Sequence, residues 1–445
     1  MWQTCGKIEC ARFDVPLDYA NPTNGQTISL LLKRRTTTGS RVGPLFVNPG
    51  GPGAAGSVVA ERASGYFSPD LLNKFDIIAW DPRGTGESAP IDCVDDIDVL
   101  LSPDPSPDSP EELGALQQAN KAFADGCRAH AARQLPFVST EYTARDMDQI
   151  RRALGDEKIS YFGFSYGSEL GATYASLFPT RVRAMVLDGA ADPTADWKES
   201  ARQQTVAFET SLNLALDECA ADKRCAFATN GNAGAAFDKV MHDLDDRPLQ
   251  VNDGRPLVGQ GVGYYAVVST LYGRDTWKDL YAALGDAQRG DGHKMLALYD
   301  GYTFRDDAEQ RNLFDSLVVI NCLDSEPVEP AEAIAFAKEL AAMAPHLGPL
   351  DQSGEQLCNF LPRSGRPTVK ITGKGAGPIL VVGTTGDTAT PFESSKNMAK
   401  ALEHGRLLTV EADRHTGYGV NRCSFRMVDA YLIDLTLPDE GKVCR

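Results

Sequence analysis

The chain has 445 residues and a net charge of −17 at pH 7. A chain of this length exceeds one small hydrophobic core, so we expect one large domain that carries an insertion, or two domains. The excess of acidic residues disfavours nucleic acids and anionic membranes as partners, and the lack of an apolar run of 18 residues predicts that no helix spans a membrane.

The first part of the chain alternates between predicted strands and helices. Residues 10–35 hold two apolar runs separated by a turn-rich sequence at 21–25, which predicts two antiparallel strands. The elements that follow are strands at 45–47 and 75–80, a proline-rich loop at 102–110, helices at 111–132 and 143–154, a strand at 159–162 with a helix after it, and a strand at 182–187. Strands that alternate with helices indicate a mainly parallel sheet.

From about residue 192 the pattern changes. Residues 194–345 show mostly helical patterns broken by glycine turns, with examples at 200–221, 234–245, 274–288 and 329–343. After a loop-rich stretch at 351–377, a strand at 378–382, a helix at 391–403, a strand at 406–411 and a helix near 425–435 follow. We predict an α/β fold with helices on both faces of a mostly parallel central sheet. Its core is residues 1–192 and 378–445, and residues 193–377 are an inserted helical cap.

A Gly-x-Ser-x-Gly pattern at residues 163–167 lies between the predicted strand at 159–162 and the helix that follows it. A serine on such a turn exposes its hydroxyl at the edge of the sheet, and the helix N-terminus behind it supplies oriented N–H groups. Side chains in place of the two glycines would crowd the neighbouring elements. The pattern alone is weak evidence in a glycine-rich chain, but this context makes Ser165 the candidate nucleophile.

A serine nucleophile needs a base, and the base needs an orienting carboxylate. Both follow the serine along the chain in a sheet of this topology. His415 lies in a loop just past the strand predicted to end near residue 411, whereas His404 lies at a helix end, where the helix dipole favours a cation. Sites form at the carboxyl ends of strands in open α/β sheets, so we favour His415 as the base.

Asp387 is the candidate orienting carboxylate, because it follows the predicted strand at 378–382. The alternative is that Asp387 caps the helix that begins near Pro391. Thr388 or Thr390 could serve as that cap instead, which would leave Asp387 free for the histidine.

Two backbone N–H groups are candidates for stabilising the oxyanion of the transition state. One belongs to Tyr166, directly after the nucleophile, and the other to Gly51 in the glycine-rich sequence at 48–53. A phosphate-binding loop is the alternative for these glycines. No Gly-Lys-Ser/Thr ending follows them, so we expect no nucleotide there.

The ten cysteines form an even set, with no Cys-x-x-Cys pair and no zinc spacing. We expect five disulfides in a secreted, extracellular protein, although buried free thiols in a cytosolic protein are an alternative. The simplest connectivity pairs sequence neighbours: Cys5–Cys10, Cys93–Cys127, Cys219–Cys225, Cys322–Cys358 and Cys423–Cys444. The first ten residues lack the apolar core of a signal peptide, and we expect that such a signal has been removed.

Several motifs together resemble one known family. They are Val-Pro-Leu-Asp-Tyr at 15–19, Asn-Pro-Gly-Gly-Pro-Gly at 48–53, Asp-Pro-Arg-Gly-Thr-Gly at 81–86, Gly-Phe-Ser-Tyr-Gly at 163–167, Asp-Gly at 188–189, and the segments around Asp387 and His415. This set is similar to secreted tripeptidyl aminopeptidases of actinomycetes, which belong to the prolyl-aminopeptidase-like α/β-hydrolases. The resemblance covers both parts of the predicted core and is weakest across the cap.

The resemblance implies Ser165 as nucleophile, His415 as base and Asp387 as orienting acid in an exported enzyme that cleaves peptides from free N-termini. Ser168 and Glu169 depart from it, because relatives more often carry a threonine and a larger neutral residue there. Glu169 therefore places a charge near the elbow helix, either solvated or facing the site.

An aminopeptidase must hold an ammonium group, which requires one or two desolvated carboxylates near the site. Asp324, Glu326 and Glu209 are candidates, because each lies near apolar sequence in the predicted cap. Ordinary surface exposure is the alternative for each of them. Asp324 is our first choice, since a disulfide at Cys322 would fix its backbone.

The resulting hypothesis is a serine exopeptidase that acts near a free N-terminus through an acyl-enzyme. An esterase or amidase that acts on small molecules with the same three catalytic residues is the first alternative, because fold does not fix substrate. A non-catalytic binding protein is the second. We expect a monomer with a peptide or small-molecule substrate, no cofactor, no metal, and neither nucleic acid nor membrane as partner.

Overall fold

A computed structural model describes residues 2–225, 227, 231–251, 254–326, 328–350, 357–364 and 368–445. Its strands are β1 (Gln3–Cys5), β2 (Ile8–Pro16), β3 (Thr27–Arg35), β4 (Gly43–Asn48), β5 (Phe75–Trp80), β6 (Ile159–Phe164), β7 (Val182–Asp188), β8 (Ile379–Thr384), β9 (Gly405–Val410) and β10 (Val443–Cys444). The predicted loop at 351–377 is described only at 357–364 and 368–377, and the rest of it lies outside the described residues.

Within the described residues the strands form one ten-stranded sheet, in the order β1-β2-β3-β5-β4-β6-β7-β8-β9-β10. The pairs from β1 to β3 and the β3–β5 pair are antiparallel. All pairs from β5 to β10 are parallel. The predicted mostly parallel sheet is therefore confirmed, and its carboxyl edge brings together the loops that follow β4, β6, β7, β8 and β9.

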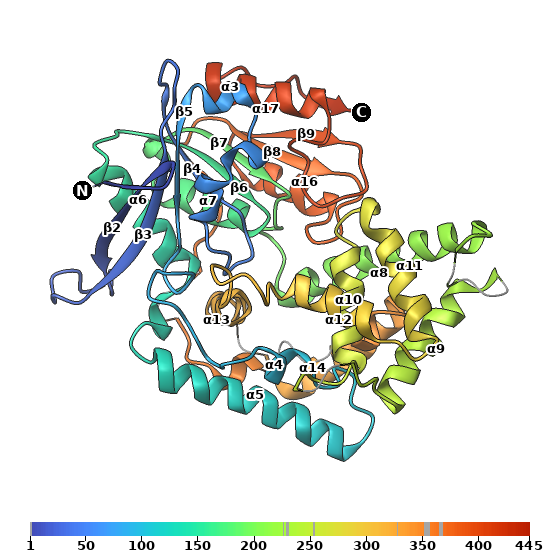
Figure 1. Ribbon diagram of the computed structural model, residues 1–445. Helices are drawn as coiled ribbons and strands as arrows, with labels where there is room; N and C mark the ends of the chain where they lie inside the picture. The colour runs from blue at the N-terminus through green and yellow to red at the C-terminus, as the bar shows by residue number, and fades with distance from the viewer. Residues whose placement is uncertain are drawn as a thin grey trace.

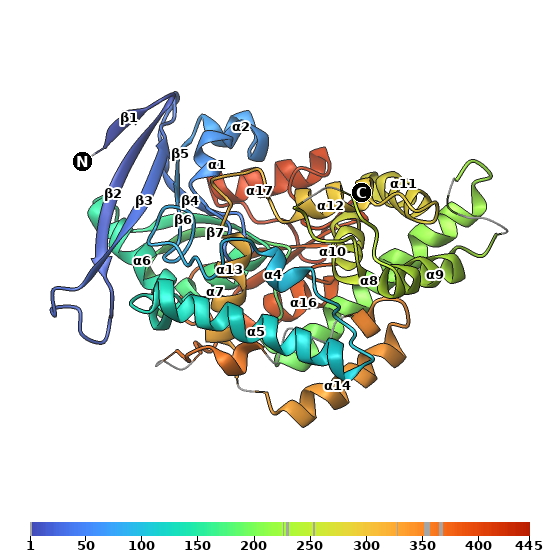
Figure 2. The ribbon, with the colours of Figure 1, turned by 60° about the horizontal axis from the view of Figure 1, so that its bottom comes forward.

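The helices around the sheet form two layers. They are α1 (Val58–Glu61), α2 (Ala63–Tyr66), α3 (Pro69–Leu72), α4 (Asp98–Leu101), α5 (Pro110–Ala131), α6 (Thr140–Ala153), α7 (Tyr166–Leu177), α16 (Phe392–Ala401) and α17 (Arg422–Asp434). Figure 2 shows α1, α2 and α17 on one side of the sheet and α6, α7 and α16 on the other.

The central strands are buried on both faces, as parallel strands between helix layers must be. In β4, Leu45 and Val47 pack in a cluster with α1, α3 and α17, whereas Phe46 packs in a cluster with α5, α6 and α7. The alternation follows from the two-residue period of a strand. The short apolar runs of the sequence thus form the buried central strands of the sheet.

Between β7 and β8 lies a segment whose regular structure is helical, which we call the helical segment. It contains α8 (Trp197–Ala221), α9 (Ala233–Asp246), α10 (Gln260–Thr270), α11 (Trp277–Ala287), α12 (His293–Tyr302), α13 (Leu313–Asp324) and α14 (Pro330–Met343). Most of it lies to one side of the sheet in Figure 1, around a third apolar cluster. The division of the chain at 192/193 and 377/378 into core and cap stays a prediction.

The predicted helices of this segment correspond to α8, α9, α11 and α14. The sequence did not single out α10, α12 and α13. In α10 and α13 apolar residues occur around most of the helix, so they lack the one-sided spacing that marks a surface helix. Such helices are recognised only once their neighbours are known.

The described residues contain five disulfides: Cys5–Cys10, Cys93–Cys127, Cys219–Cys225, Cys322–Cys358 and Cys423–Cys444. The pairing of sequence neighbours is confirmed. Two of them fix strands too short to be predicted, since Cys5–Cys10 closes the β1–β2 hairpin and Cys423–Cys444 joins α17 to β10. Among the described helices, none combines the length and apolar character needed to cross a membrane.

Candidate active site

Ser165 lies between β6 and α7 in a backbone conformation that side chains rarely adopt. Its φ is +54° and its ψ is −126°, and a sparsely populated conformation of this kind costs about 1–3 kcal/mol. The Ser165 N–H donates to the Asp188 carbonyl at 2.8 Å, and the Ser165 carbonyl accepts from the Ser168 N–H at 2.7 Å. The strained turn expected of a nucleophile elbow is present.

The two glycines of the motif allow β4, β6 and α7 to meet closely. A Cβ at Gly167 would lie 2.8 Å from the Asn48 carbonyl oxygen, and a Cβ at Gly163 would overlap the Gly167 carbonyl. Both contacts are with backbone atoms, which cannot move aside as a flexible side chain can. The need for glycine at both positions is therefore steric.

His415 and Asp387 are brought together by the loops that follow β9 and β8. His415 Nδ1 lies 2.8 Å from Asp387 Oδ1 and 2.9 Å from Oδ2. The Asp387 side chain is fully buried, while 14% of the His415 side chain is exposed. A carboxylate at Nδ1 selects the tautomer in which Nε2 can accept a proton. A Cβ at Gly189 would lie 3.1 Å from His415 Cε1, so the imidazole lies over the turn after β7, the strand next to β6.

Asp387 also organises the turn before α16. Its carboxylate accepts hydrogen bonds from the N–H groups of Ala389, Thr390 and Thr416, at 3.1, 2.9 and 3.1 Å. The Thr390 hydroxyl lies 3.2 Å from Asp387 Oδ2 and 3.3 Å from His415 Nδ1. The sequence posed a helix cap as the alternative to this contact with the histidine, but Pro391 is the N-cap residue of α16 and, among the described residues, no side chain caps that helix.

The glycine-rich loop after β4 lies directly over Ser165. A Cβ at Gly50 would lie 2.9 Å from Ser165 Cβ and 3.4 Å from the Tyr166 nitrogen. The φ angles of Gly50 and Gly51, +104° and +106°, favour glycine. The Gly50 N–H donates to Asn48 Oδ1 at 2.9 Å. In the part of the chain that the structure describes, the backbone hydrogen bonds outside the regular elements include none from the N–H of Gly51 or Tyr166, so both stay the predicted donors to an oxyanion.

His404 lies at the other end of the sheet from these residues. It immediately precedes β9, and its carbonyl accepts the Ile379 N–H at 3.0 Å where β8 begins. His415 follows the carboxyl end of β9. The preference for His415 over His404 therefore agrees with the position of each histidine along the same strand.

Two of the three carboxylates predicted to hold an ammonium group make no hydrogen bond, among those described, to Ser165, Asp387 or His415. Glu209 in α8 is only 4% exposed. Its two oxygens accept the N–H groups of His346 at 3.3 Å and Leu347 at 3.0 Å, which fixes the chain after α14. Glu326 is exposed in the loop after α13.

Asp324, the third of them, lies near the residue that follows the nucleophile. It accepts the Thr140 N–H at 3.0 Å and the Thr140 hydroxyl at 2.7 Å, and the Thr140 hydroxyl lies 2.5 Å from the Tyr166 hydroxyl. Burial, with a contribution from the charge of Asp324, raises the pKa of Glu169 to about 7. Burial likewise raises the pKa of Asp324 to about 6. The sequence could not place Glu169 with Asp324, because α7 and α13 are far apart in the chain.

The helical segment reaches His415 through Tyr272, which no motif marks. The Tyr272 carbonyl accepts the His415 N–H at 2.8 Å, and the ring lies edge-on to the imidazole with centroids 5.7 Å apart. The hydroxyls of Tyr272 and Tyr302 are 3.4 Å apart, and Tyr302 packs on Phe314 at 5.4 Å between ring centroids. His415 is therefore bordered by the ring of Tyr272, which belongs to a row of aromatic side chains from three parts of the helical segment.

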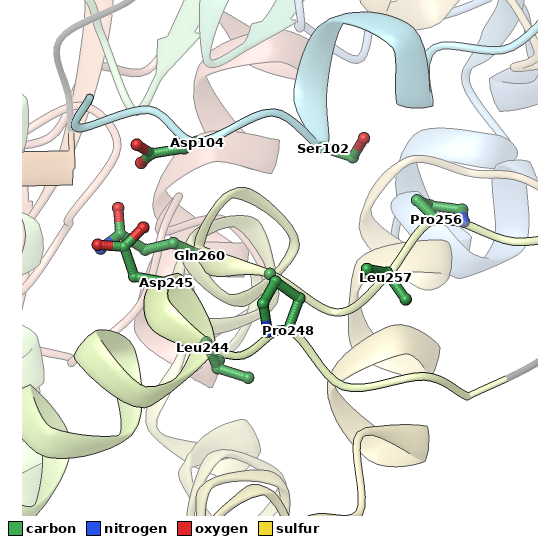
Figure 3. A pocket seen from close by; sticks show the side chains of 9 residues that line it. Ser102, Asp104, Leu244, Asp245, Pro248, Pro256, Leu257 and Gln260 are labelled. Carbon is green, nitrogen blue, oxygen red and sulfur yellow. The ribbon is translucent and has the colours of Figure 1, made fainter. Parts of the chain in front are cut away.

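A pocket lies away from these residues. In Figure 3, Asp104 and Asp245 lie near Gln260 in a pocket between the loop after α4 and the helices α9 and α10. Carboxylate oxygens of Asp104, Asp245 and Glu112 lie within 4.8 Å of one another, and burial raises the pKa of Asp245 to about 6. None of the predicted catalytic residues lines this pocket.

Comparison with known proteins gives matches over nearly the whole chain. A family model described as the alpha/beta hydrolase fold matches residues 43–421. Serine protease Hip1 of Mycobacterium tuberculosis is 35% identical over 469 residues, which cover 99% of this chain and 88% of that protein. Carboxylesterase B of the same organism is 35% identical over 452 residues (98% and 86%). Tripeptidyl aminopeptidase of Streptomyces lividans is 30% identical over 456 residues (97% and 82%).

Proposed function

The chain belongs to the α/β-hydrolase family, and on that premise we propose that it is a serine exopeptidase that hydrolyses peptide bonds near a free N-terminus. The observation that carries this proposal is the strained Ser165 turn, which is hydrogen-bonded to the end of β7, together with the His415–Asp387 pair, whose imidazole lies over the turn after β7. The relatives named serine protease and tripeptidyl aminopeptidase support a peptide as substrate. The five disulfides support export, since such bonds persist in oxidising compartments.

In the proposed reaction, Ser165 Oγ attacks the carbonyl carbon of the scissile bond while His415 Nε2 takes the hydroxyl proton. The N–H groups of Gly51 and Tyr166 stabilise the charge on the carbonyl oxygen. The C–N bond then breaks, His415 returns its proton to the leaving amine, and the acyl group remains as an ester on Ser165. Water attacks this ester with His415 as base, which releases the acid and restores the serine.

Asp387 orients His415 throughout this cycle. Its negative charge stabilises the imidazolium that forms on His415, and its contact with Nδ1 keeps Nε2 directed to the reaction. The hydrogen bonds from Thr390 and Thr416 hold the carboxylate in one orientation, so no reorganisation is needed when the charge develops.

The proposed site for the substrate ammonium is the Glu169–Asp324 pair. Both carboxyl groups have a raised pKa because the surrounding protein desolvates them, while each residue keeps partial contact with solvent, and the charge of Asp324 adds to the shift of Glu169. An ammonium group between them would favour the ionised form of both and offset their desolvation. Glu209 and Glu326 are not part of this proposal, because the oxygens of Glu209 hold the chain after α14 and solvent surrounds Glu326. Asp324, by contrast, is joined through the Thr140 hydroxyl to Tyr166, the residue that follows Ser165.

The proposal is tested by cleavage of chromogenic amides of one, two and three residues, each with a free and an acetylated N-terminus, by the parent enzyme and by Ser165→Ala. We expect release from free-amine peptides only, greatest for three residues and lost in the variant. Equal cleavage of acetylated peptides would contradict an exopeptidase that recognises the amine. Full activity of Ser165→Ala would contradict serine catalysis altogether.

The second candidate is an esterase or amidase that acts on small molecules. It is favoured by the relative named Carboxylesterase B, which is as similar to this chain as the relative named serine protease. The same panel with short-chain nitrophenyl esters separates the two. An esterase would hydrolyse the esters with a higher kcat/KM than any free-amine peptide and would be indifferent to acetylation.

A further inference from the structure

A second buried carboxylate, Asp188, contacts the loop that carries the histidine. Asp188 ends β7 and is fully buried. Its Oδ1 accepts the Gly417 N–H at 2.7 Å, and its Oδ2 accepts the Tyr418 N–H at 2.8 Å. A buried carboxylate is expensive to desolvate unless it is hydrogen-bonded, and here both oxygens take backbone donors that follow His415.

The same residue contacts the nucleophile through its backbone. The Asp188 carbonyl accepts the Ser165 N–H at 2.8 Å, which helps to hold the strained turn. The next residue, Gly189, has a φ of +64°, and a Cβ there would lie 3.1 Å from His415 Cε1. The end of β7 is therefore in contact with the serine on one side and with the imidazole and its loop on the other.

The histidine loop is held by three successive N–H groups. The Thr416 N–H donates to Asp387, and those of Gly417 and Tyr418 donate to Asp188. Thr416 itself has a left-handed φ of +65°, a conformation that a non-glycine residue keeps only where its surroundings impose it. The two carboxylates together impose it, one from β8 and one from β7.

We propose that Asp188 is a positioning residue for the reaction: by accepting from two consecutive N–H groups with its two oxygens, it fixes the loop that sets His415 against Ser165. This inference rests on the proposed serine hydrolase chemistry but not on a peptide substrate. Asp188 acts through the histidine, since its hydrogen bonds go to the backbone of the loop. A change in its acceptors should therefore alter the turnover of bound substrate and leave substrate binding almost unchanged.

Asp188→Asn tests the role of the second acceptor. Asparagine has one acceptor oxygen, so its amide N–H₂ would face one of the two N–H groups and leave it unsatisfied. With an activated ester as substrate, we expect kcat to fall about 10- to 100-fold while KM stays within about twofold, in keeping with small displacements of a catalytic group. Phosphonylation by a fluorophosphonate should slow by the same factor, yet go to completion.

Asp76→Asn is the matched control. Asp76 is 6% exposed, and its carboxylate accepts the Thr37 N–H at 2.8 Å and pairs with Arg41 at 2.6 Å. It is the second residue of β5 and therefore lies at the amino end of this strand, opposite to the carboxyl edge that carries the site. We expect this variant to lose stability but to keep the parent kcat for each labelled active site.

A double-mutant comparison separates positioning from general destabilisation. If Asp188 acts through the imidazole, Asp188→Asn should reduce the residual activity of His415→Ala by less than about twofold. Multiplicative loss in the double variant, or an unchanged kcat in Asp188→Asn, would overturn the inference. So would a loss of activity explained entirely by fewer labelled sites.

Asp188→Ser supplies the same test if the asparagine variant does not fold. Serine is smaller than aspartate and has one acceptor oxygen in place of two. The kcat of this variant should therefore fall because one of the two N–H groups loses its acceptor, and a parent-like kcat would contradict the inference. The proposed function is tested separately. Retention of ester hydrolysis by Ser165→Ala would contradict the serine mechanism. A multiplicative loss in the Asp188→Asn, His415→Ala double variant would contradict only the role of Asp188.

Discussion

The carboxyl edge of the sheet and the helical segment contact His415 in different ways. At the sheet edge, Asp387 and Asp188 bind the histidine and its loop through charged hydrogen bonds of 2.7–3.1 Å. From the helical segment, Tyr272 contributes one backbone hydrogen bond and an aromatic contact. Hydrogen bonds to a carboxylate are directional and fix a geometry, whereas aromatic packing tolerates changes of shape.

This difference separates the two tasks of the site. The residues of the sheet edge follow paired parallel strands, so their positions depend on the core of the fold. The position of Tyr272 and its aromatic neighbours in the helical segment depends on the packing of the apolar cluster of that segment. Substitutions at the sheet edge should therefore lower kcat for every substrate, and substitutions in the helical segment should change which substrate is used.

The largest effect is expected at Asp387. In Asp387→Asn, the side-chain amide no longer selects the tautomer that leaves His415 Nε2 free, and kcat should fall about 10³- to 10⁴-fold. The loss should be the same for peptides and for activated esters, as measured by steady-state kinetics on both. A loss confined to peptides would show that the sheet edge also selects the substrate.

A smaller and more selective loss is expected at Glu169. Glu169→Gln removes a charge from the proposed ammonium site, so kcat/KM for free-amine peptides should fall about 10- to 100-fold, as when a buried charge pair is broken. Acetylated peptides and esters should be unaffected. Glu326→Gln, which changes an exposed carboxylate two residues from Asp324, is the control and should resemble the parent.

The pH dependence sharpens this prediction. Because the pKa of Glu169 is raised to about 7, the group is protonated below that pH and ionised above it. Only the ionised form attracts an ammonium, so kcat/KM for free-amine peptides should rise between about pH 6 and 8 more steeply than for esters. The extra rise should disappear in Glu169→Gln. Identical profiles for both substrate classes in the parent would place the ammonium elsewhere.

A contact in the helical segment should give a still smaller effect. Tyr272→Ala removes the ring that lies against His415 and Tyr302 but keeps the backbone bond to the His415 N–H. We expect kcat/KM to change about tenfold or less, by different factors for peptides with large and small apolar residues next to the scissile bond. Tyr272→Phe, which lacks only the hydroxyl, should stay near the parent. A uniform loss for all substrates would instead assign Tyr272 to the support of the base.

The sequence predicted more of the sheet edge than of the helical segment, for a physical reason. Ser165, Asp387 and His415 each follow a short apolar run. A pattern of this kind lies within a few neighbouring residues, so it can be recognised from the sequence without knowledge of the fold. The positions of Tyr272 and Glu169 relative to the site are set by contacts between segments far apart in the chain. The position of Glu209, away from Ser165, Asp387 and His415, is set in the same way. Asp188 was read as part of a motif, but its role depends on where the histidine loop crosses β7.

The smallest effects on activity are expected from the disulfides, one on each side of the comparison. Cys423→Ser with Cys444→Ser opens the bond between α17 and β10, and the stability should fall by about 2–4 kcal/mol with kcat of the folded enzyme within about twofold of the parent. Cys322→Ser with Cys358→Ser opens a bond two residues from Asp324, so KM for free-amine peptides should rise while kcat for esters stays unchanged. Thermal unfolding and kinetics on both substrates measure these outcomes. A fall in kcat for esters in the second variant would mean that the helical segment sets the catalytic geometry as well as the choice of substrate.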